Sequence, residues 1–190
     1  MDKDLFHSLE GKYTYFKPVT IDDTEAMHVF TSDKETKKYI GWRLMNTIDE
    51  TRAHVEELIK REEAGTHLYA SIVVKSTETV IGTAMLFNFD KESNQAEIGY
   101  VLNKEYWNKG YGSECVELVS RFAFESLKLH KIHASVVSAN IGSARILEKN
   151  GYELEGRLKD HFFIDGNYHD DLLFGKFEVK EYWSKRTVLK

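Results

Sequence analysis

Residues 97–113 read Glu-Ile-Gly-Tyr-Val-Leu-Asn-Lys-Glu-Tyr-Trp-Asn-Lys-Gly-Tyr-Gly-Ser, and they join two segments of different character. The first half completes an extended segment, residues 95–102, with the composition of a strand. The second half opens a segment whose apolar residues recur at i, i+3, i+4 and i+7, which predicts a helix: Cys115, Leu118, Val119 and Phe122. A glycine loop between strand and helix presents free backbone N–H groups at the positive end of the helix dipole. The stretch therefore predicts a binding site for phosphate or pyrophosphate.

The glycines of this loop match neither of two common phosphate-binding motifs. The pattern GxxxxGK[ST] of a P-loop is absent, and Cys115 stands where a dinucleotide-binding fingerprint has its third glycine. Gly110 and Gly112 therefore allow two interpretations. They form a backbone cradle for an anion, or they make a tight strand-to-helix turn that binds nothing.

The remaining segments predict a mixed domain. Thr47 and Glu50 have the spacing of a capping box, so a helix begins there and ends near Gly65. The sequence Asp165-Gly166-Asn167 is typical of a hairpin turn. Strands are expected at residues 12–17, 68–74, 80–89, 95–102, 131–138, 152–163 and 168–177, and helices begin near Thr20, Thr47, Gly110 and Asn140. The predicted fold class is α/β (α+β), with a mostly antiparallel sheet of six to seven strands, about four helices and one strand-helix-strand unit near the middle.

Length and charge limit the kind of protein. The 190 residues predict a single domain, 1–190. The net charge of −5 provides no basic field for nucleic acid or an anionic membrane, so neither is expected as a partner. No stretch approaches the length of a membrane span, and the N-terminus lacks the features of a signal peptide. A lone cysteine, Cys115, agrees with a reducing compartment, and we predict a cytoplasmic protein.

A second motif follows one strand later, where residues 140–152 read Asn-Ile-Gly-Ser-Ala-Arg-Ile-Leu-Glu-Lys-Asn-Gly-Tyr. Together with the loop Tyr-Trp-x-Lys-Gly-Tyr-Gly and the ending Asp-Gly-Asn-Tyr-His-Asp at 165–170, it resembles the GNAT acyltransferase superfamily. More narrowly, the combination is similar to the branch that contains the ribosomal-protein N-terminal acetyltransferases. The resemblance covers nearly the whole chain, from the helix at Thr20 to the last strand.

The resemblance implies acetyl-CoA as the donor. A pyrophosphate suits a helix start, and an extended pantetheine chain can pair with a strand edge as a peptide does. The implied pyrophosphate contacts are Asn108, Lys109, Gly110, Tyr111, Gly112 and Ser113; the implied pantetheine contacts are Gly99, Tyr100 and Val101, where two neighbouring strands part. Asn140 is implied to reach the cofactor arm. No metal is needed for this chemistry, and none is assigned.

Glu97 is the candidate general base, because the attacking amine must lose a proton. In an extended strand, Glu97 projects to the same face as Gly99 and Val101, the stretch expected to hold pantetheine. The alternative is a strand carboxylate with no role in the reaction.

The departing thiolate also benefits from a donor, and here the chain departs from the family. Many GNAT enzymes carry a tyrosine on the helix after the asparagine motif, whereas Leu147 occupies that position here. Ser143 is the nearby hydroxyl that the ribosomal-protein branch shares, although it also fits a residue that only hydrogen-bonds at a helix start. Trp107 replaces the Gln or Arg of the broad family pattern. Cys115 falls on the packed helix face, where a buried structural thiol is favoured over an acyl carrier.

The acceptor pocket is implied to lie between the helical region after the first strand and the strand ends near the thioester. Its candidate walls are Tyr39, Trp42, Phe87, Tyr100 and Phe162, with His161 and Asp170 as polar candidates. Aromatic residues at such positions also fit plain core packing.

These observations predict an N-acetyltransferase that transfers an acetyl group directly from acetyl-CoA to a primary amine. The acceptor implied by the resemblance is a protein N-terminus, such as that of a ribosomal protein. A small amine (a polyamine, amino sugar, amino acid or antibiotic) is the alternative substrate, and an acyl-CoA-binding sensor without turnover is the alternative class. A homodimer is the working hypothesis for the oligomeric state.

Overall fold

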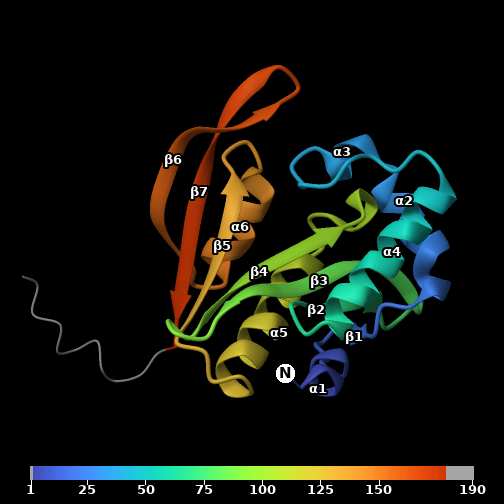
Figure 1. The fold of residues 1–190 in the computed structure, drawn as a ribbon, viewed down its shortest axis with the longest axis horizontal. Helices are drawn as coiled ribbons and strands as arrows, with labels where there is room; N and C mark the ends of the chain where they lie inside the picture. Colours follow the sequence, from blue (N-terminus) through green and yellow to red (C-terminus); the bar gives the residue numbers. More distant parts are fainter. Residues whose placement is uncertain (1, 179–190) are drawn as a thin grey trace, which may run out of the picture.

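The computed structural model describes residues 2–178, so residues 1 and 179–190 of the predicted 1–190 domain lie outside the described part. These residues form one twisted seven-stranded sheet with helices on both faces (Figure 1). The strand order is β1-β2-β3-β4-β5-β7-β6. The strands are β1 (Thr14–Lys17), β2 (Leu68–Val74), β3 (Thr79–Asp90), β4 (Gln95–Leu102), β5 (Lys131–Val137), β6 (Glu153–Ile164) and β7 (Asn167–Phe177).

The helices outnumber the four expected from periodicity. Within residues 2–178 they are α1 (Lys3–His7), α2 (Thr24–Thr31), α3 (Lys34–Lys37), α4 (Ile48–Glu63), α5 (Tyr111–Glu125) and α6 (Ile141–Lys149), with the 3₁₀ turns η1 (Ile21–Asp23) and η2 (Lys104–Tyr106). The additional helices α1 and α3 span one turn each. The predicted capping box of α4 is confirmed, since Thr47 Oγ1 accepts the Glu50 N–H at 3.2 Å and Glu50 accepts the Thr47 N–H at 3.3 Å.

The sheet has the predicted topology. Strands β2, β3 and β4 form an antiparallel meander, and β4-α5-β5 is a strand-helix-strand unit whose two strands are parallel. The hairpin between β6 and β7 turns at Asp165 (φ 50°) and Gly166 (φ 80°). Two successive residues with positive φ match the right-handed twist of the flanking strands, which explains the Asp-Gly pair.

Side-chain alternation along the strands separates two apolar clusters, one on each face of the sheet. The larger cluster lies under α1, α5 and α6 and includes Phe6, Phe122 and Leu147. The smaller cluster lies under α2 and α4 and includes Phe30 and Val55. Because neighbouring strand residues point to opposite faces, β4 at the centre of the sheet contributes side chains to both clusters.

Across residues 2–178, helices of the length and apolar character that a bilayer crossing requires do not occur.

Candidate active site

The sheet divides at its centre. Strands β4 and β5 pair only over Gln95–Glu97 and Lys131–His133. Beyond that point β4 stays paired with β3, while β5 stays paired with β7, so the two strands diverge (Figure 1). The predicted place where neighbouring strands part is therefore present, and the facing backbone of β4 is left without a strand partner over residues 98–102.

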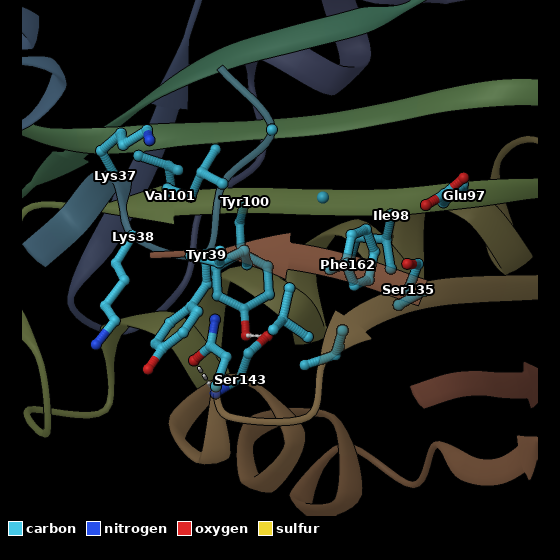
Figure 2. A pocket seen from close by; sticks show the side chains of 18 of the residues that line it. Lys37, Lys38, Tyr39, Glu97, Ile98, Tyr100, Val101, Ser135, Ser143 and Phe162 are labelled. Carbon is cyan, nitrogen blue, oxygen red and sulfur yellow. Dashed lines mark hydrogen bonds between the residues drawn. The ribbon is translucent and has the colours of Figure 1, made fainter. Parts of the chain in front are cut away.

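A cavity of about 480 Å³ occupies this divergence (Figure 2). It is bounded by β4, β5, α6, the segment after α3 and the end of β6. Of the residues predicted from the sequence, the lining contains Tyr39, Phe87, Glu97, Gly99, Tyr100, Val101, Asn140, Ser143 and Phe162. The lining also contains residues that were not site candidates, among them Lys37, Lys38, Met85, Ser135 and Asp165. Figure 2 shows the two lysines at one end and Glu97 at the other.

Glu97 projects from β4 into this cavity and has a specific partner. The amide Nδ2 of Asn88 donates to Glu97 Oε2 at 2.8 Å. Asn88 has a φ of 50° and sits where the β3–β4 register shifts, a bulge that turns its side chain toward Glu97. Asn88 was not a candidate from the sequence; the signal available there is the tolerance of asparagine for a left-handed φ.

The hydroxyl groups of Tyr100 and Ser143 meet inside the cavity. Tyr100 Oη, from β4, lies 3.0 Å from Ser143 Oγ, from the first turn of α6 (Figure 2). Asn140 caps α6 by accepting the Ser143 N–H at 3.2 Å on Oδ1. Leu147, one turn further along α6, is buried and lines the same cavity. Burial raises the pKa of Tyr100 well above its ordinary value, so the phenol stays protonated at neutral pH.

The predicted pyrophosphate loop, residues 108–113, does not line the cavity and forms the start of α5. Gly110 is the N-cap, with a φ of 89° that an L-residue side chain disfavours. By helix geometry the first-turn N–H groups of α5 lack partners within the helix, so this end fits an anion. Ser113 Oγ instead accepts from Asn150 Nδ2 at 3.1 Å, which ties α5 to α6.

Close packing explains why residue 112 is a glycine. A Cβ at this position would lie 2.8 Å from Ile146 Cδ1 of α6 and 3.3 Å from Leu102 Cδ1 of β4. The missing side chain therefore lets α6 approach α5 closely, whatever its part in holding a phosphate.

Trp42 and Asp170 are not among the residues that line the cavity. The Trp42 ring packs edge-on to His54 of α4 with ring centroids 5.0 Å apart. Asp170 is engaged across the β6–β7 hairpin, where it accepts the Asp160 N–H at 2.9 Å and pairs with Arg157. The Asp160 N–H and Arg157 hold the pKa of Asp170 below its ordinary value. Both side chains thus have packing and pairing partners outside this cavity.

Cys115 lies where the helical periodicity predicted, with its thiol fully buried against the sheet. Burial raises its pKa, so the thiol does not ionise at neutral pH. The expected burial is confirmed.

The segment that carries the two cavity lysines is anchored to the end of β4. Asp33 caps α3 by accepting the Thr36 N–H at 2.8 Å, and its other oxygen lies 2.7 Å from Lys104 Nζ in η2. Partial burial opposes ionisation of Asp33, but Lys104 and Thr36 hold its pKa below the ordinary value. The wall of the cavity and the chain that leads into residues 108–113 are therefore joined by an ion pair.

A sheet divided at its centre, a helix start beside the division, and a carboxylate and a hydroxyl inside it define an enzyme of the acyl-transfer class. Residues 14–153 match the model of the acetyltransferase (GNAT) domain. The chain therefore belongs to the GNAT acetyltransferase family, and it is an acetyl-CoA-dependent N-acetyltransferase.

Curated relatives and solved structures agree with this family. The chain is 34% identical over 167 residues to the probable N-acetyltransferase YjcK of Bacillus subtilis, covering 85% of this chain and 92% of that protein. It is 30% identical over 158 residues to the N-acetyltransferase p20 of Bacillus licheniformis, covering 83% and 89%. A GNAT-family acetyltransferase from Bacillus anthracis superposes with a TM-score of 0.79 at 26% identity, covering 89% and 97%.

Two further structures share the fold but differ in the acceptor that their descriptions state. One is a spermidine N-acetyltransferase from Vibrio cholerae in complex with CoA and spermine, with a TM-score of 0.77, 21% identity, and 88% and 96% coverage. The other is a ribosomal-protein-S5-alanine acetyltransferase from Vibrio fischeri, with a TM-score of 0.77, 22% identity, and 90% and 96% coverage. At these identities the likeness establishes the fold alone.

Proposed function

We propose that this N-acetyltransferase acts on the N-terminal amine of a ribosomal or other protein. The supporting observation is the balance of charge around the cavity. The lysines of its lining are Lys37 and Lys38, and the carboxylates are Glu97 and Asp165. A polyamine carries several ammonium groups at neutral pH and needs more carboxylates than cations around it. An acceptor with a single amine and flanking peptide groups has no such requirement.

Acetyl-CoA, when bound, supplies the thioester, and the amine attacks the carbonyl carbon of its acetyl group. In the proposed arrangement Glu97 accepts the proton that the amine loses, and Asn88 keeps the carboxylate oriented. Ser143 donates a hydrogen bond to the departing sulfur. The open backbone edge of β4, residues 99–101, pairs with the amides of the cofactor arm, and the N–H groups of residues 108–113 hold its phosphates.

A small amino sugar, amino acid or antibiotic remains the second candidate, favoured by the aromatic walls Tyr39, Phe87 and Phe162. The family assignment favours an enzyme over the alternative class, an acyl-CoA-binding sensor without turnover. The cytoplasmic location and the homodimer stay predictions.

A CoA-release assay tests the acceptor class. At neutral pH, peptides with a free N-terminal alanine or serine are expected to give a kcat/KM at least about tenfold above that of spermidine, a difference of about 1.4 kcal/mol. Glucosamine represents the small mono-amines. A preference for spermidine over every peptide would overturn the proposal.

Charge reversal supplies the matched variants. Lys37→Glu with Lys38→Glu should raise kcat/KM for spermidine by about fivefold, as expected from about 1 kcal/mol of altered charge interaction near a surface. Lys34→Glu, on the same short helix but outside the cavity lining, should leave that value unchanged. The double variant lowers the net charge by four units and Lys34→Glu lowers it by two. A logarithmic response to Lys34→Glu half as large as that to the double variant would mean that the lysines act through the net charge of the protein alone.

A further inference from the structure

Tyr100 and Ser143 form a partly buried pair of hydroxyl groups within the cavity. Their oxygens are 3.0 Å apart. Among residues 2–178, each of the two hydroxyl groups has the other as its one hydrogen-bond partner. Tyr100 comes from the strand beside the division of the sheet, whereas Ser143 comes from the helix that covers it. The pair therefore bridges the two walls between which the thioester is proposed to lie.

Either oxygen is able to donate in this hydrogen bond, and the partial burial of the phenol favours Tyr100 as the donor. A buried phenol needs an acceptor for its O–H, and Ser143 Oγ is the acceptor within reach of Tyr100. A serine hydroxyl has one proton and two lone pairs, so it can accept from Tyr100 and still donate elsewhere. Ser143 lines the cavity, and its own proton is consequently left to point into it.

We propose that Tyr100 is a positioning residue that, by donating to Ser143 Oγ, turns the Ser143 hydroxyl toward the sulfur that leaves. This inference rests on the proposed role of Ser143 as the donor to that sulfur. In the transfer, the N–C bond forms, the C–S bond breaks and the amine proton passes to Glu97. The sulfur keeps the electron pair of the broken bond and accepts the hydrogen bond from Ser143. Tyr100 keeps its proton throughout, as burial requires.

The position of Leu147 explains why the phenol comes from a strand. The family resemblance places a tyrosine there on α6, but the leucine is 1% exposed and contributes only apolar surface to the cavity. Tyr100 reaches the first turn of the same helix from β4. The phenol is therefore present at the cavity, but it acts on the serine and not directly on the sulfur.

The fold contains a matched control for this pair. Tyr152 Oη lies 2.9 Å from Ser120 Oγ, and both side chains are buried between α5 and the segment before β6. Neither residue lines the cavity. Burial raises the pKa of Tyr152 as it does that of Tyr100. Removing the Tyr152 hydroxyl thus removes a tyrosine–serine hydrogen bond between residues that do not line the cavity.

The experiment compares Tyr100→Phe, Tyr152→Phe, Ser143→Ala and the double variant Tyr100→Phe/Ser143→Ala in steady-state kinetics, with a melting temperature for each protein. Tyr100→Phe should lower kcat about tenfold, the effect of one lost hydrogen bond, while KM for acetyl-CoA stays within about twofold. Tyr152→Phe should cost similar stability and leave kcat unchanged. The double variant should be no slower than Ser143→Ala, because the tyrosine acts through the serine.

The outcomes separate this inference from the function on which it rests. Full activity of Tyr100→Phe beside a slow Ser143→Ala removes the positioning role and keeps the serine. Losses that multiply in the double variant show that Tyr100 acts independently of Ser143, which also overturns the inference. Full activity of Ser143→Ala removes the proposed role of the serine itself. Ser143→Thr keeps the oxygen that Tyr100 contacts, and it should recover most of the kcat lost in Ser143→Ala; if it does not, the hydroxyl is not the active group.

Discussion

Glu97 is held by Asn88, a residue whose backbone conformation is unusual for a side chain other than glycine. The left-handed φ of 50° at Asn88 carries a modest strain that asparagine tolerates better than most residues. That strain is placed where it directs an amide donor onto the candidate base, at 2.8 Å. This hydrogen bond favours one orientation of the Glu97 carboxylate, which lines the cavity.

Replacing Glu97 by Gln tests proton transfer at the residue scale. The amide keeps the shape of the carboxylate but is not basic, so kcat should fall about 10²- to 10⁴-fold while the affinity for CoA stays unchanged. The loss should shrink as the pH rises, because more of the amine is then neutral without help. Steady-state kinetics across pH 6–10 with the preferred amine provides the measurement.

The control for that change is Glu92→Gln, in the exposed turn between β3 and β4, which should retain full activity. Activity of Glu97→Gln within about threefold of the unchanged enzyme near neutral pH would exclude Glu97 as the base. The proton would then leave to solvent or to another group.

At the scale of the element, the start of α5 contains two glycines with different structural roles. Gly110 has a positive φ and open space around it, whereas Gly112 faces Ile146 across a close helix contact. A substitution at Gly112 would disturb the packing of α5 on α6. Of the two glycines, Gly110 is therefore the one at which an effect on acetyl-CoA binding can be measured separately from an effect on folding.

Gly110→Ala should weaken acetyl-CoA binding about tenfold, because the strained residue shifts the N–H groups that are proposed to hold phosphate. Its cost in the free energy of unfolding should be about 1 kcal/mol, the penalty of an L-residue at positive φ. Gly65→Ala is the matched control: Gly65 also has a positive φ (71°), also has nothing near its missing side chain, and follows α4. Binding by calorimetry and unfolding by denaturant measure the two effects.

Equal destabilisation of both alanine variants with unchanged acetyl-CoA binding would leave Gly110 as a turn residue only. The cofactor phosphates would then have to bind elsewhere than at the start of α5.

The elements that the sequence predicted are those with repeated physical signals. The capping box of α4, the apolar face of α5 and the Asp165-Gly166 turn each combine two independent features, and each is present in the structure. The helices α1 and α3 were missed because five and four residues are too few to show a helical period. Their formation depends on tertiary contacts, such as Phe6 of α1 packing against Phe122 with ring centroids 5.1 Å apart.

At the scale of the whole molecule, acetyl-CoA should stabilise the fold. A ligand at 100 times its dissociation constant adds about 2.7 kcal/mol to the free energy of unfolding. For a chain of 190 residues this corresponds to a rise in the melting temperature of roughly 5–11 °C. Differential scanning calorimetry with and without acetyl-CoA measures the rise, and adenosine at the same concentration serves as the control. No change at millimolar acetyl-CoA contradicts the proposed binding mode.

The candidate site was predictable to the extent that residues near in sequence carry it. Strand alternation led to Glu97, and the family resemblance implied residues 99–101; all of these line the cavity. The contacts that join distant segments, Asn88 with Glu97 and Tyr100 with Ser143, depend on a bulge and on how α6 crosses the sheet. Trp42 and Asp170 were chosen from their place along the chain and the family resemblance, and in the structure they contact His54 and Arg157.

The early end of the β4–β5 pairing leaves the protein with an internal seam. An ordinary open sheet has two edges, but this one has four beyond Glu97 and His133, and the inner two face each other across a gap too wide for hydrogen bonds. If the cofactor arm pairs there as proposed, it takes the place of a missing eighth strand, made of pantetheine instead of peptide. The amide hydrogens of residues 98–102 on that seam would then exchange slowly with deuterated solvent only in the complex. The donor substrate would, in this sense, complete the secondary structure of the enzyme.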